Sequence, residues 1–245
     1  MRFTLLLLLC VVALAGDASA QTIDIQKLLG STNGETSGRI VQLLIGMTVL
    51  SLAPGILITV TCFTRFIIAF SFLRAGLGLP TTPSNMILIS LSLFMTFFVM
   101  APTFEKSWEN GVKPLLENKI TEKEALPLIA APFREFMLSH VRPKDLQMFE
   151  EFAGDRIPKA ENPADTDLRI VVPAFMVSEL RRGFEIGFLI LLPFLVIDLI
   201  VAILTMSMGM MMLSPTVIAL PFKVLFFVLI DGWNKIVGAL VRSIG

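Results

Sequence analysis

Residues 197–223 read IDLIVAILTMSMGMMMLSPTVIALPFK and join the last two long apolar segments of the chain, residues 186–213 and 216–241. The five methionines of this stretch would surround the axis of a helix rather than form one stripe, because successive side chains are turned by about 100°. Gly209 weakens a helix at this point, and Pro215 cannot continue one. The sequence therefore predicts a broken or looped segment between two helices.

Ionisable residues lie on both sides of the methionines. Asp198 and Lys223 are equally far along the chain from the methionine segment, and so are Glu185 and Lys235. A lone charge at the centre of a bilayer costs about 2.5–3.5 kcal/mol or more, so such residues pair or face an aqueous path. We predict an antiparallel helical hairpin in which both pairs meet, with Asp198–Lys223 as the inner ion pair. Asp231, before a Gly-Trp pair, indicates an interfacial turn or a subunit contact.

The methionines and Asp198 each have two interpretations. Flexible thioether side chains fill irregular gaps, and a ring of apolar side chains closes a pore by dewetting. The methionines therefore form either a pore gasket or apolar packing in a turn between two lipid-facing helices. Asp198 acts either in proton coupling or subunit contact, or only as one half of an ion pair that sets the register of the hairpin. The candidate gasket residues are Met206, Met208, Met210, Met211 and Met212.

The composition indicates a membrane protein. Hydrophobic residues make up 55% of the 245 residues and charged residues only 16%, against about a quarter charged in a soluble domain. The mean hydropathy is +0.80. Because the net charge is zero, nothing points to nucleic acid. We predict an all-α integral membrane protein built of helical hairpins, with about four long apolar helices, several of them broken.

The N-terminus is typical of a secretory signal peptide. Arg2 precedes an apolar run, and an Ala-Ser-Ala cleavage site ends at Ala20. The alternative is an uncleaved first transmembrane helix, but the run is short for the roughly 30 Å of hydrocarbon that such a helix crosses. We predict that residues 1–20 are removed before Gln21 and that residues 21–38 form a periplasmic lead-in.

The rest of the chain divides into two apolar parts and a polar one. Residues 39–102 predict a first helical hairpin, residues 103–184 a small polar helical insert, and residues 185–245 the second hairpin with the methionine loop. The connection within the first hairpin carries Arg65 and Arg74 but no acid. The positive-inside rule places this connection in the cytoplasm and makes the two arginines topology anchors. Alternation then places the insert, like the N-terminus, in the periplasm.

The insert shows helix signals but no catalytic motif. Thr121 and Glu124 have the spacing of a capping box, whereas residues 154–173, with three prolines and many charges, predict a loop. The sequence has no Gly-rich phosphate loop, no GxSxG and no nucleophile beside a base. One histidine, His140, and one mature cysteine, Cys62, are too few for a structural zinc site. We predict no enzymatic activity, no metal and no cofactor.

Several motifs together resemble the FliP/SctR family of export-gate proteins. They are PAFMVSEL at 173–180, MGMMMLSP at 208–215, LPFK at 220–223 and FVLIDGW at 227–233, preceded by FTR at 63–65, SFLR at 71–74 and TFFVM at 96–100. The resemblance covers about residues 38–243. Its one visible departure is at residues 83–85, which read Pro-Ser-Asn where many relatives have two prolines.

The resemblance implies the core pore subunit of the flagellar type III export gate, which passes unfolded flagellar proteins across the bacterial inner membrane in the basal body. It implies a homo-oligomer, a pentamer, with FliQ, FliR, FlhB and FlhA as partners, and a gasket at Met210, Met211 and Met212. Such helices form a cone raised above the bilayer, so four spans describe insertion rather than the assembled state. The signal peptide favours the flagellar branch over the injectisome relatives.

A proton-coupled small-solute transporter is the alternative class of function. It would explain Asp198 and Lys223 within apolar segments. It would also predict a second, inverted copy of the same pattern. The first apolar pair contains no matching Asp and Lys, so the sequence favours protein export.

Overall fold

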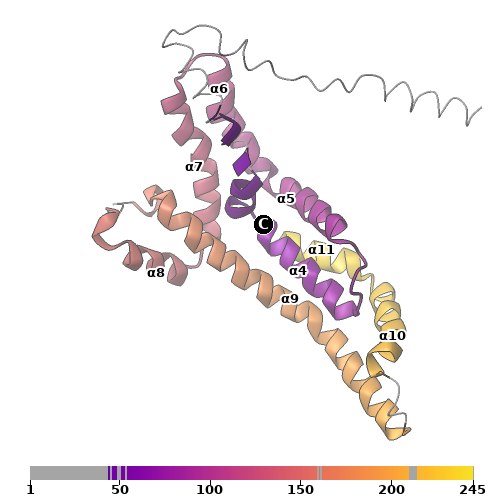
Figure 1. Cartoon of the computed structure of the whole chain (residues 1–245). Coiled ribbons are helices and arrows are strands. Elements are labelled where there is room, and N and C mark those ends of the chain that lie inside the picture. The colour runs from indigo at the N-terminus through magenta and orange to yellow at the C-terminus, as the bar shows by residue number, and fades with distance from the viewer. Residues whose placement is uncertain are drawn as a thin grey trace, which may run out of the picture. The chain divides into compact units, whose positions relative to one another are not determined.

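The computed structural model describes residues 44, 46–48, 51–52, 54–158, 160, 162–209 and 214–244. The chain divides into two units, residues 1–53 and residues 54–245, and the described part of the second unit is helical, without a strand (Figure 1). Its elements are the helix Pro54–Val60, α4 (Phe63–Leu77), α5 (Asn85–Ser107), a π-helical turn (Trp108–Val112), α6 (Lys113–Leu116), α7 (Glu122–His140), α8 (Pro143–Ala153), 3₁₀ turns at Gly154–Arg156 and Pro163–Asp165, α9 (Leu168–Ser207), α10 (Pro215–Leu229) and α11 (Gly232–Arg242). The predicted cleavage site at Ala20 and Gln21 lies outside the described residues.

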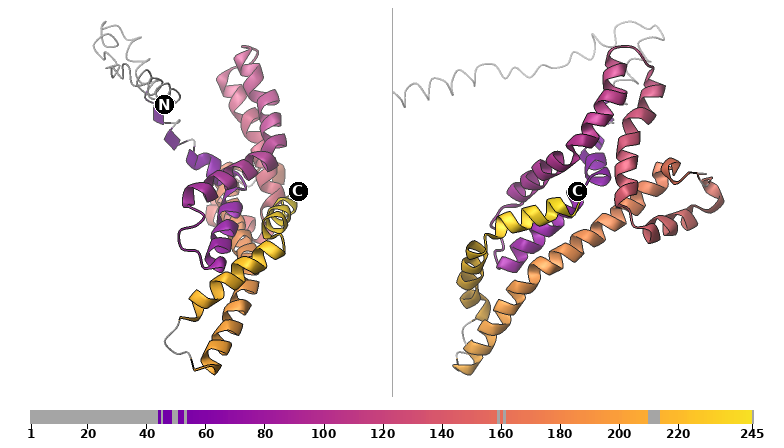
Figure 2. Two further views of the ribbon diagram at one scale, coloured as in Figure 1. Left: turned by 90° about the vertical axis from the view of Figure 1, so that its right-hand side faces the viewer. Right: turned by 180° about the vertical axis from the view of Figure 1, so that it is seen from behind.

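The 40-residue helix α9 organises the second unit. Its first turn is capped by Asp167, whose Oδ1 accepts a hydrogen bond of 2.8 Å from the Arg169 backbone N–H. α4 packs along its middle, α8 packs on its N-terminal part and α10 on its C-terminal part. Figure 2 shows from two further sides that α10 runs back along the end of α9. The predicted second hairpin is therefore present as α9 and α10.

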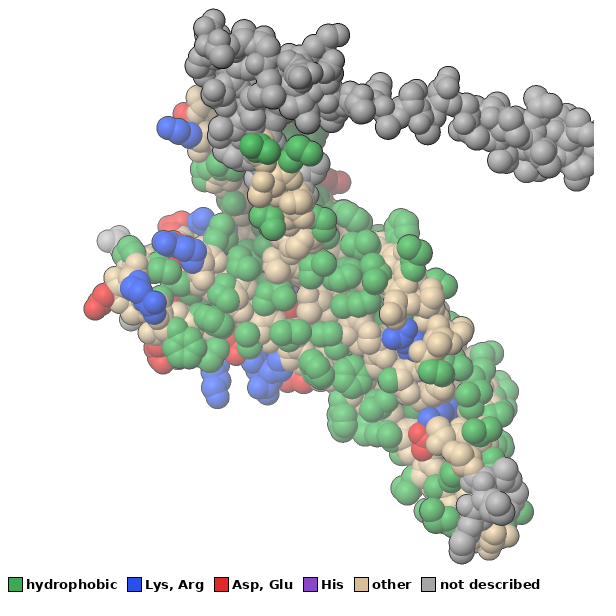
Figure 3. Space-filling model, viewed as in Figure 1, with side chains coloured by type: hydrophobic (Ala, Val, Ile, Leu, Met, Phe, Trp, Pro, Cys, Tyr) green, Lys and Arg blue, Asp and Glu red, His purple; other side chains and the backbone are tan. Residues whose placement is uncertain are grey.

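The described helices include two to four candidate membrane spans. α9 and the continuous helix Asn85–Leu116 are long and apolar enough to cross a bilayer. Two bent pairs also qualify if each counts as one span: Pro54–Val60 with α4, bent by 84°, and α10 with α11, bent by 64°. Figure 3 shows hydrophobic side chains over most of one face, whereas charged side chains gather mainly around α8 and the start of α9. The prediction of an all-α membrane protein with broken apolar helices is confirmed.

Two of the predicted domain boundaries lie within continuous helices. α5 (Asn85–Ser107) runs across the boundary at residues 102 and 103, and α9 runs across the one at residues 184 and 185. The first residues of the insert continue α5 and its last residues belong to α9, whereas α7 and α8 are separate helices within it, because a helix ends where its backbone hydrogen bonds end and not where its side chains become polar. The predicted loop at residues 154–173 likewise ends earlier, at Asp167, where α9 is capped.

The capping box predicted at Thr121 begins α7. The Thr121 backbone N–H donates to Glu124 Oε2 at 2.9 Å, and this bond lowers the pKa of the Glu124 carboxyl below its ordinary value. The helix Pro54–Val60 bends into α4 at Thr61 and Cys62. The Thr61 hydroxyl donates to the Leu57 carbonyl at 2.7 Å and so competes with the backbone bonds of the helix.

The main apolar core lies along α4. Phe66 and Phe70 are fully buried and stack with their ring centroids 6.5 Å apart. Met100 of α5 and Leu240 of α11 belong to the same cluster, and so does Ile244 beyond the end of α11. The last residues of the chain therefore pack against the centre of this unit.

Candidate functional site

The break between α9 and α10 is produced by a glycine and a proline. Gly209 has a φ of 73°, in the left-handed region where a side chain would be strained, and its N–H donates to the Met206 carbonyl at 3.0 Å. Pro215 occupies the first position of α10, where a missing N–H removes no helical bond. The predicted break in the methionine segment is therefore confirmed at its described ends.

The inner ion pair of the hairpin is present. Lys223 Nζ of α10 lies 2.6 Å from Asp198 Oδ2 of α9. The Lys223 side chain is 3% exposed and the Asp198 side chain 35% exposed. A buried ammonium group needs such a partner because its desolvation costs several kcal/mol. The pair connects the two arms and holds their register, as the spacing predicted, while Asp198 Oδ1 is buried without a hydrogen-bond partner.

The predicted outer pair, Glu185 with Lys235, is wrong. Glu185 Oε1 accepts from Arg181 Nε at 2.7 Å, one turn earlier on α9, and Lys235 is exposed on α11. The reason is the 64° bend between α10 and α11. Beyond this bend, equal distances along the chain no longer bring side chains to the same level of the hairpin.

The bend itself is at Asp231, where a turn was expected. Asp231 has a φ of 52°, a conformation that Asp adopts more readily than most residues. Its Oδ2 accepts from Asn234 Nδ2 at 3.1 Å in the first turn of α11. The turn is confirmed, and its place at a membrane interface or a subunit contact stays a prediction.

Two of the five candidate gasket residues are described. Met206 and Met208, at the end of α9, are 67% and 73% exposed. Met210, Met211 and Met212 lie outside the described residues. The tip of the hairpin therefore carries long apolar side chains that nothing in the described chain covers.

An apolar groove of about 540 Å³ lies between α9 and α10 near this tip. Its walls include Ile197, Leu204 and Met208 of the α9 side and Phe222 and Phe226 of α10. Filling such a groove with apolar groups removes hydrophobic surface from water, which contributes about 25 cal/mol per Å². The hairpin thus offers an apolar surface next to the ion pair that joins its two arms.

Arg65 does not have the surroundings of a topology anchor. Such an anchor places its charge in water or among lipid head groups, whereas Arg65 is fully buried. Its Nε donates to Glu179 Oε2 at 2.9 Å, its Nη2 donates to Glu179 Oε1, and its Nη1 donates to the Ser243 carbonyl at 2.8 Å. The prediction for Arg65 is corrected: the residue joins α4, α9 and the C-terminus.

Glu179 is the residue that the sequence interpretation missed. It is the only acid in the motif PAFMVSEL, and Arg65 follows a long uncharged segment. Two isolated opposite charges in apolar surroundings are a signal for pairing, because neither is stable alone. The signal does not say which charges meet, since Arg65 and Glu179 lie 114 positions apart.

Arg74 closes the turn between α4 and α5. Its Nη1 donates to Asn85 Oδ1 at 2.5 Å and to the Pro83 carbonyl at 3.3 Å. The side chain is half-buried. These contacts give Arg74 a structural role in the turn, and its role as an anchor stays a prediction.

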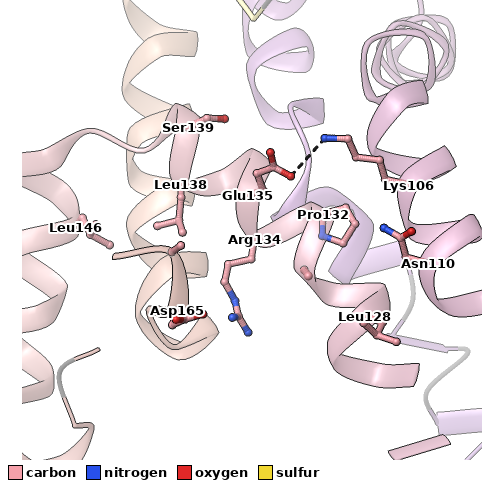
Figure 4. A pocket seen from close by; sticks show the side chains of 12 residues that line it. Lys106, Asn110, Leu128, Pro132, Arg134, Glu135, Leu138, Ser139, Leu146 and Asp165 are labelled. Carbon is pink, nitrogen blue, oxygen red and sulfur yellow. Dashed lines mark hydrogen bonds and ion pairs between the residues drawn. The ribbon is translucent and has the colours of Figure 1, made fainter. Parts of the chain in front are cut away.

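The insert contains a second groove, lined by both apolar and polar residues, of about 840 Å³ between α5, α7 and the turn at Pro163–Asp165. Figure 4 shows Lys106 and Glu135 reaching toward each other across one wall, with the Arg134 guanidinium extending into the open space. Lys106 Nζ lies 3.4 Å from Glu135 Oε2. Among the described residues, no group of three or more His, Cys, Asp or Glu could hold a metal ion.

The hairpin, its inner ion pair and the motifs around them can be compared with known proteins. The model of the FliP family matches residues 46–240. The chain belongs to the FliP family. The flagellar biosynthetic protein FliP of Rhizobium meliloti (strain 1021) is 58% identical and aligns over 96% of this chain and 96% of its own length. FliP of Bacillus subtilis (strain 168) is 49% identical over 88% of this chain and 97% of its own length.

The family resemblance predicted from the motifs is therefore confirmed. FliP of Agrobacterium fabrum (strain C58 / ATCC 33970) is also 58% identical, over 95% of both chains. These relatives are named as flagellar biosynthetic proteins, which supports a role in flagellar export for this member of the FliP family. Together with the apolar helices, the match indicates a membrane-embedded flagellar component.

Proposed function

We propose that this FliP-family chain is a pore subunit of the flagellar type III export gate, which passes unfolded flagellar proteins across the inner membrane. The observation that carries the proposal is the α9–α10 hairpin, broken at Gly209 and held by Asp198–Lys223. A hairpin of this kind presents its tip at a defined place, because the ion pair fixes how far each arm extends.

In this proposal the tips of several hairpins converge on one conduit and their methionines close it. Methionine side chains are unbranched and adaptable, so a ring of them can seal against a passing chain of any sequence. An apolar constriction also excludes ions, because water leaves a narrow apolar passage. The exposure of Met206 and Met208 at the tip supports this role, which we extend to Met210, Met211 and Met212.

The proposed assembly is a homo-oligomer, a pentamer, together with subunits of the FliQ, FliR, FlhB and FlhA types. Large exposed apolar residues along α9, such as Leu189, Leu199 and Ile203, support contacts with lipid or other subunits. The Asp198 side chain is 35% exposed, which supports its contact with a group from outside the single chain. We place the N-terminus and the insert in the periplasm, and the role is not enzymatic.

The gasket is tested by replacing Met210, Met211 and Met212 together with Ala, and in a matched variant with Leu. The Ala variant shortens three side chains and is expected to let ions leak during secretion, while the Leu variant keeps their volume and leaks less. The measurement is the collapse of membrane potential in secreting cells, with secreted flagellin as the control for assembly. An Ala variant that secretes flagellin and stays ion-tight would contradict the gasket.

A further inference from the structure

The C-terminal residues of this chain are held more firmly than chain termini usually are. Termini are normally exposed and poorly ordered unless particular contacts tie them down. Ile244 is only 9% exposed and packs in the same cluster as Leu240 and Phe66. The Ser243 and Ile244 backbone N–H groups donate to the Ala239 and Val241 carbonyls at 3.0 and 3.1 Å, so the tail continues the last turn of α11.

The first side chain that holds this tail is Arg65. The guanidinium carries five N–H donors and accepts nothing. Glu179 binds Nε and Nη2, and the Ser243 carbonyl and Oγ accept from Nη1 at 2.8 and 3.1 Å. Arg65 is fully buried, so loss of Ser243 would leave a charged donor without a partner and without water. The tail thus completes the buried ion pair of α4 and α9, although Ser243 lies 178 positions from Arg65.

The second side chain is His140, at the end of α7. Its Nε2 lies 2.8 Å from the Ile244 carbonyl. A carbonyl oxygen only accepts hydrogen bonds, so the ring donates to Ile244 in the tautomer that carries its proton on Nε2, and Nδ1 then accepts from the Ser139 hydroxyl. At the other side of the ring, Nδ1 lies 2.8 Å from the Phe136 carbonyl and 2.9 Å from Ser139 Oγ. The ring is therefore oriented at both ends and directed at the tail.

We propose that Ser243 and Ile244 form a C-terminal latch, which holds α11 to α4 through Arg65 and to α7 of the insert through His140. Phe133 and Phe136 of α7 pack against the same core cluster as Leu240 and Ile244, so the latch adds its hydrogen bonds to an apolar contact. The latch acts on the hairpin as well as on α11. A Cβ on Gly232 would lie 2.2 Å from the Phe227 ring, so the chain turns tightly from α10 into α11.

The latch therefore connects the insert with the hairpin that carries the methionine segment. Movement of α7 changes the position of the tail, the tail positions α11, and α11 sets the direction of α10. This coupling is a property of the chain itself and does not rest on the proposed export function.

The test is hydrogen exchange of the full chain in lipid nanodiscs, with three variants of the latch. His140→Phe keeps an aromatic ring but removes the donor to Ile244, and His140→Gln keeps a donor at a similar reach. Ser243→Ala removes the Oγ that accepts from Arg65 Nη1 but leaves the carbonyl that accepts from the same nitrogen, so it removes part of the Arg65 side of the latch. We expect the C-terminal amides to exchange about five- to tenfold faster in His140→Phe, as the loss of one net hydrogen bond predicts.

His140→Gln is the control and should stay within about twofold of the unaltered chain, whereas Ser243→Ala should accelerate exchange of the same amides. Equal acceleration in the Phe and Gln variants would show that His140 only packs, and no acceleration in His140→Phe would show that the tail is held without it. Either result overturns the latch. Deletion of Ile244 and Gly245 adds a reciprocal readout: the latch predicts faster exchange at the end of α7. Unchanged exchange there also overturns it, and if this truncation does not fold, the His140 variants decide.

Discussion

The ion pairs Arg65–Glu179 and Lys223–Asp198 differ in how completely their groups are satisfied. Arg65 and Glu179 are both fully buried, contact each other through two hydrogen bonds, and have a third partner in the Ser243 carbonyl. Lys223 is almost fully buried, but it has one contact with Asp198, which keeps one buried oxygen unbonded. The first pair is satisfied within the chain, whereas the second leaves one buried oxygen without a hydrogen bond and the Asp198 side chain 35% exposed.

This difference suggests different roles for the two pairs: Arg65–Glu179 in the stability of the folded chain and Lys223–Asp198 in contact with other subunits. A buried charge pair with all its hydrogen bonds made adds nothing for a partner to bind, so its loss is felt in the folded chain itself. The pair Lys223–Asp198, in which the Asp198 side chain is 35% exposed, is less costly to change but better placed to contact a neighbouring subunit. We therefore expect changes at the two pairs to affect different measurements.

The largest effect is expected for Glu179→Ala. This change leaves the Arg65 guanidinium buried with two of its contacts removed, and breaking such a pair costs about 3–5 kcal/mol. Thermal unfolding of the purified chain in nanodiscs measures the loss. Glu179→Gln keeps one acceptor oxygen and should cost less. The comparison fails if Glu179→Ala is no more destabilising than Asp198→Ala.

A smaller effect is expected from exchanging the charges of the hairpin. Asp198→Lys and Lys223→Asp each place two like charges together and should cost about 1–3 kcal/mol, while the double variant restores an opposite pair. Thermal unfolding and the diameter of swimming halos are measured for all three. A double variant no better than either single one would show that the contact does not hold the hairpin. If the double variant recovers stability but not swimming, Asp198 itself is needed for contact with another subunit.

The smallest effect is expected at Glu185, on the exposed part of α9. Its contact with Arg181 is an exposed pair one turn apart, for which about 0.3–0.5 kcal/mol is usual. A double-mutant cycle of Glu185→Gln with Arg181→Gln should give a coupling of this size, and a cycle with Lys235→Gln should give none. Measurable coupling between Glu185 and Lys235 would show that the two residues do form a pair despite the bend at Asp231.

The motifs alone were enough to predict much of this molecule. Apolar segments predicted the helices, Gly209 and Pro215 predicted the break, and equal spacing about the methionines predicted the contact of Asp198 with Lys223. These features are local or nearly local, because residues close to a hairpin turn can meet only across that turn. The same reasoning failed for Lys235, since a second bend at Asp231 lies between it and the hairpin.

Tertiary structure decided the role of Arg65 and the place of the C-terminus. Nothing in the sequence near Arg65 names Glu179 or Ser243 as its neighbours, and nothing near His140 names Ile244, because these contacts join segments more than a hundred positions apart. Which isolated charges pair depends on how α4, α7, α9 and α11 pack, and packing is set by the fit of many side chains together. Local sequence therefore determined the helices and the loop, and the cooperative packing of distant segments determined which buried groups satisfy one another.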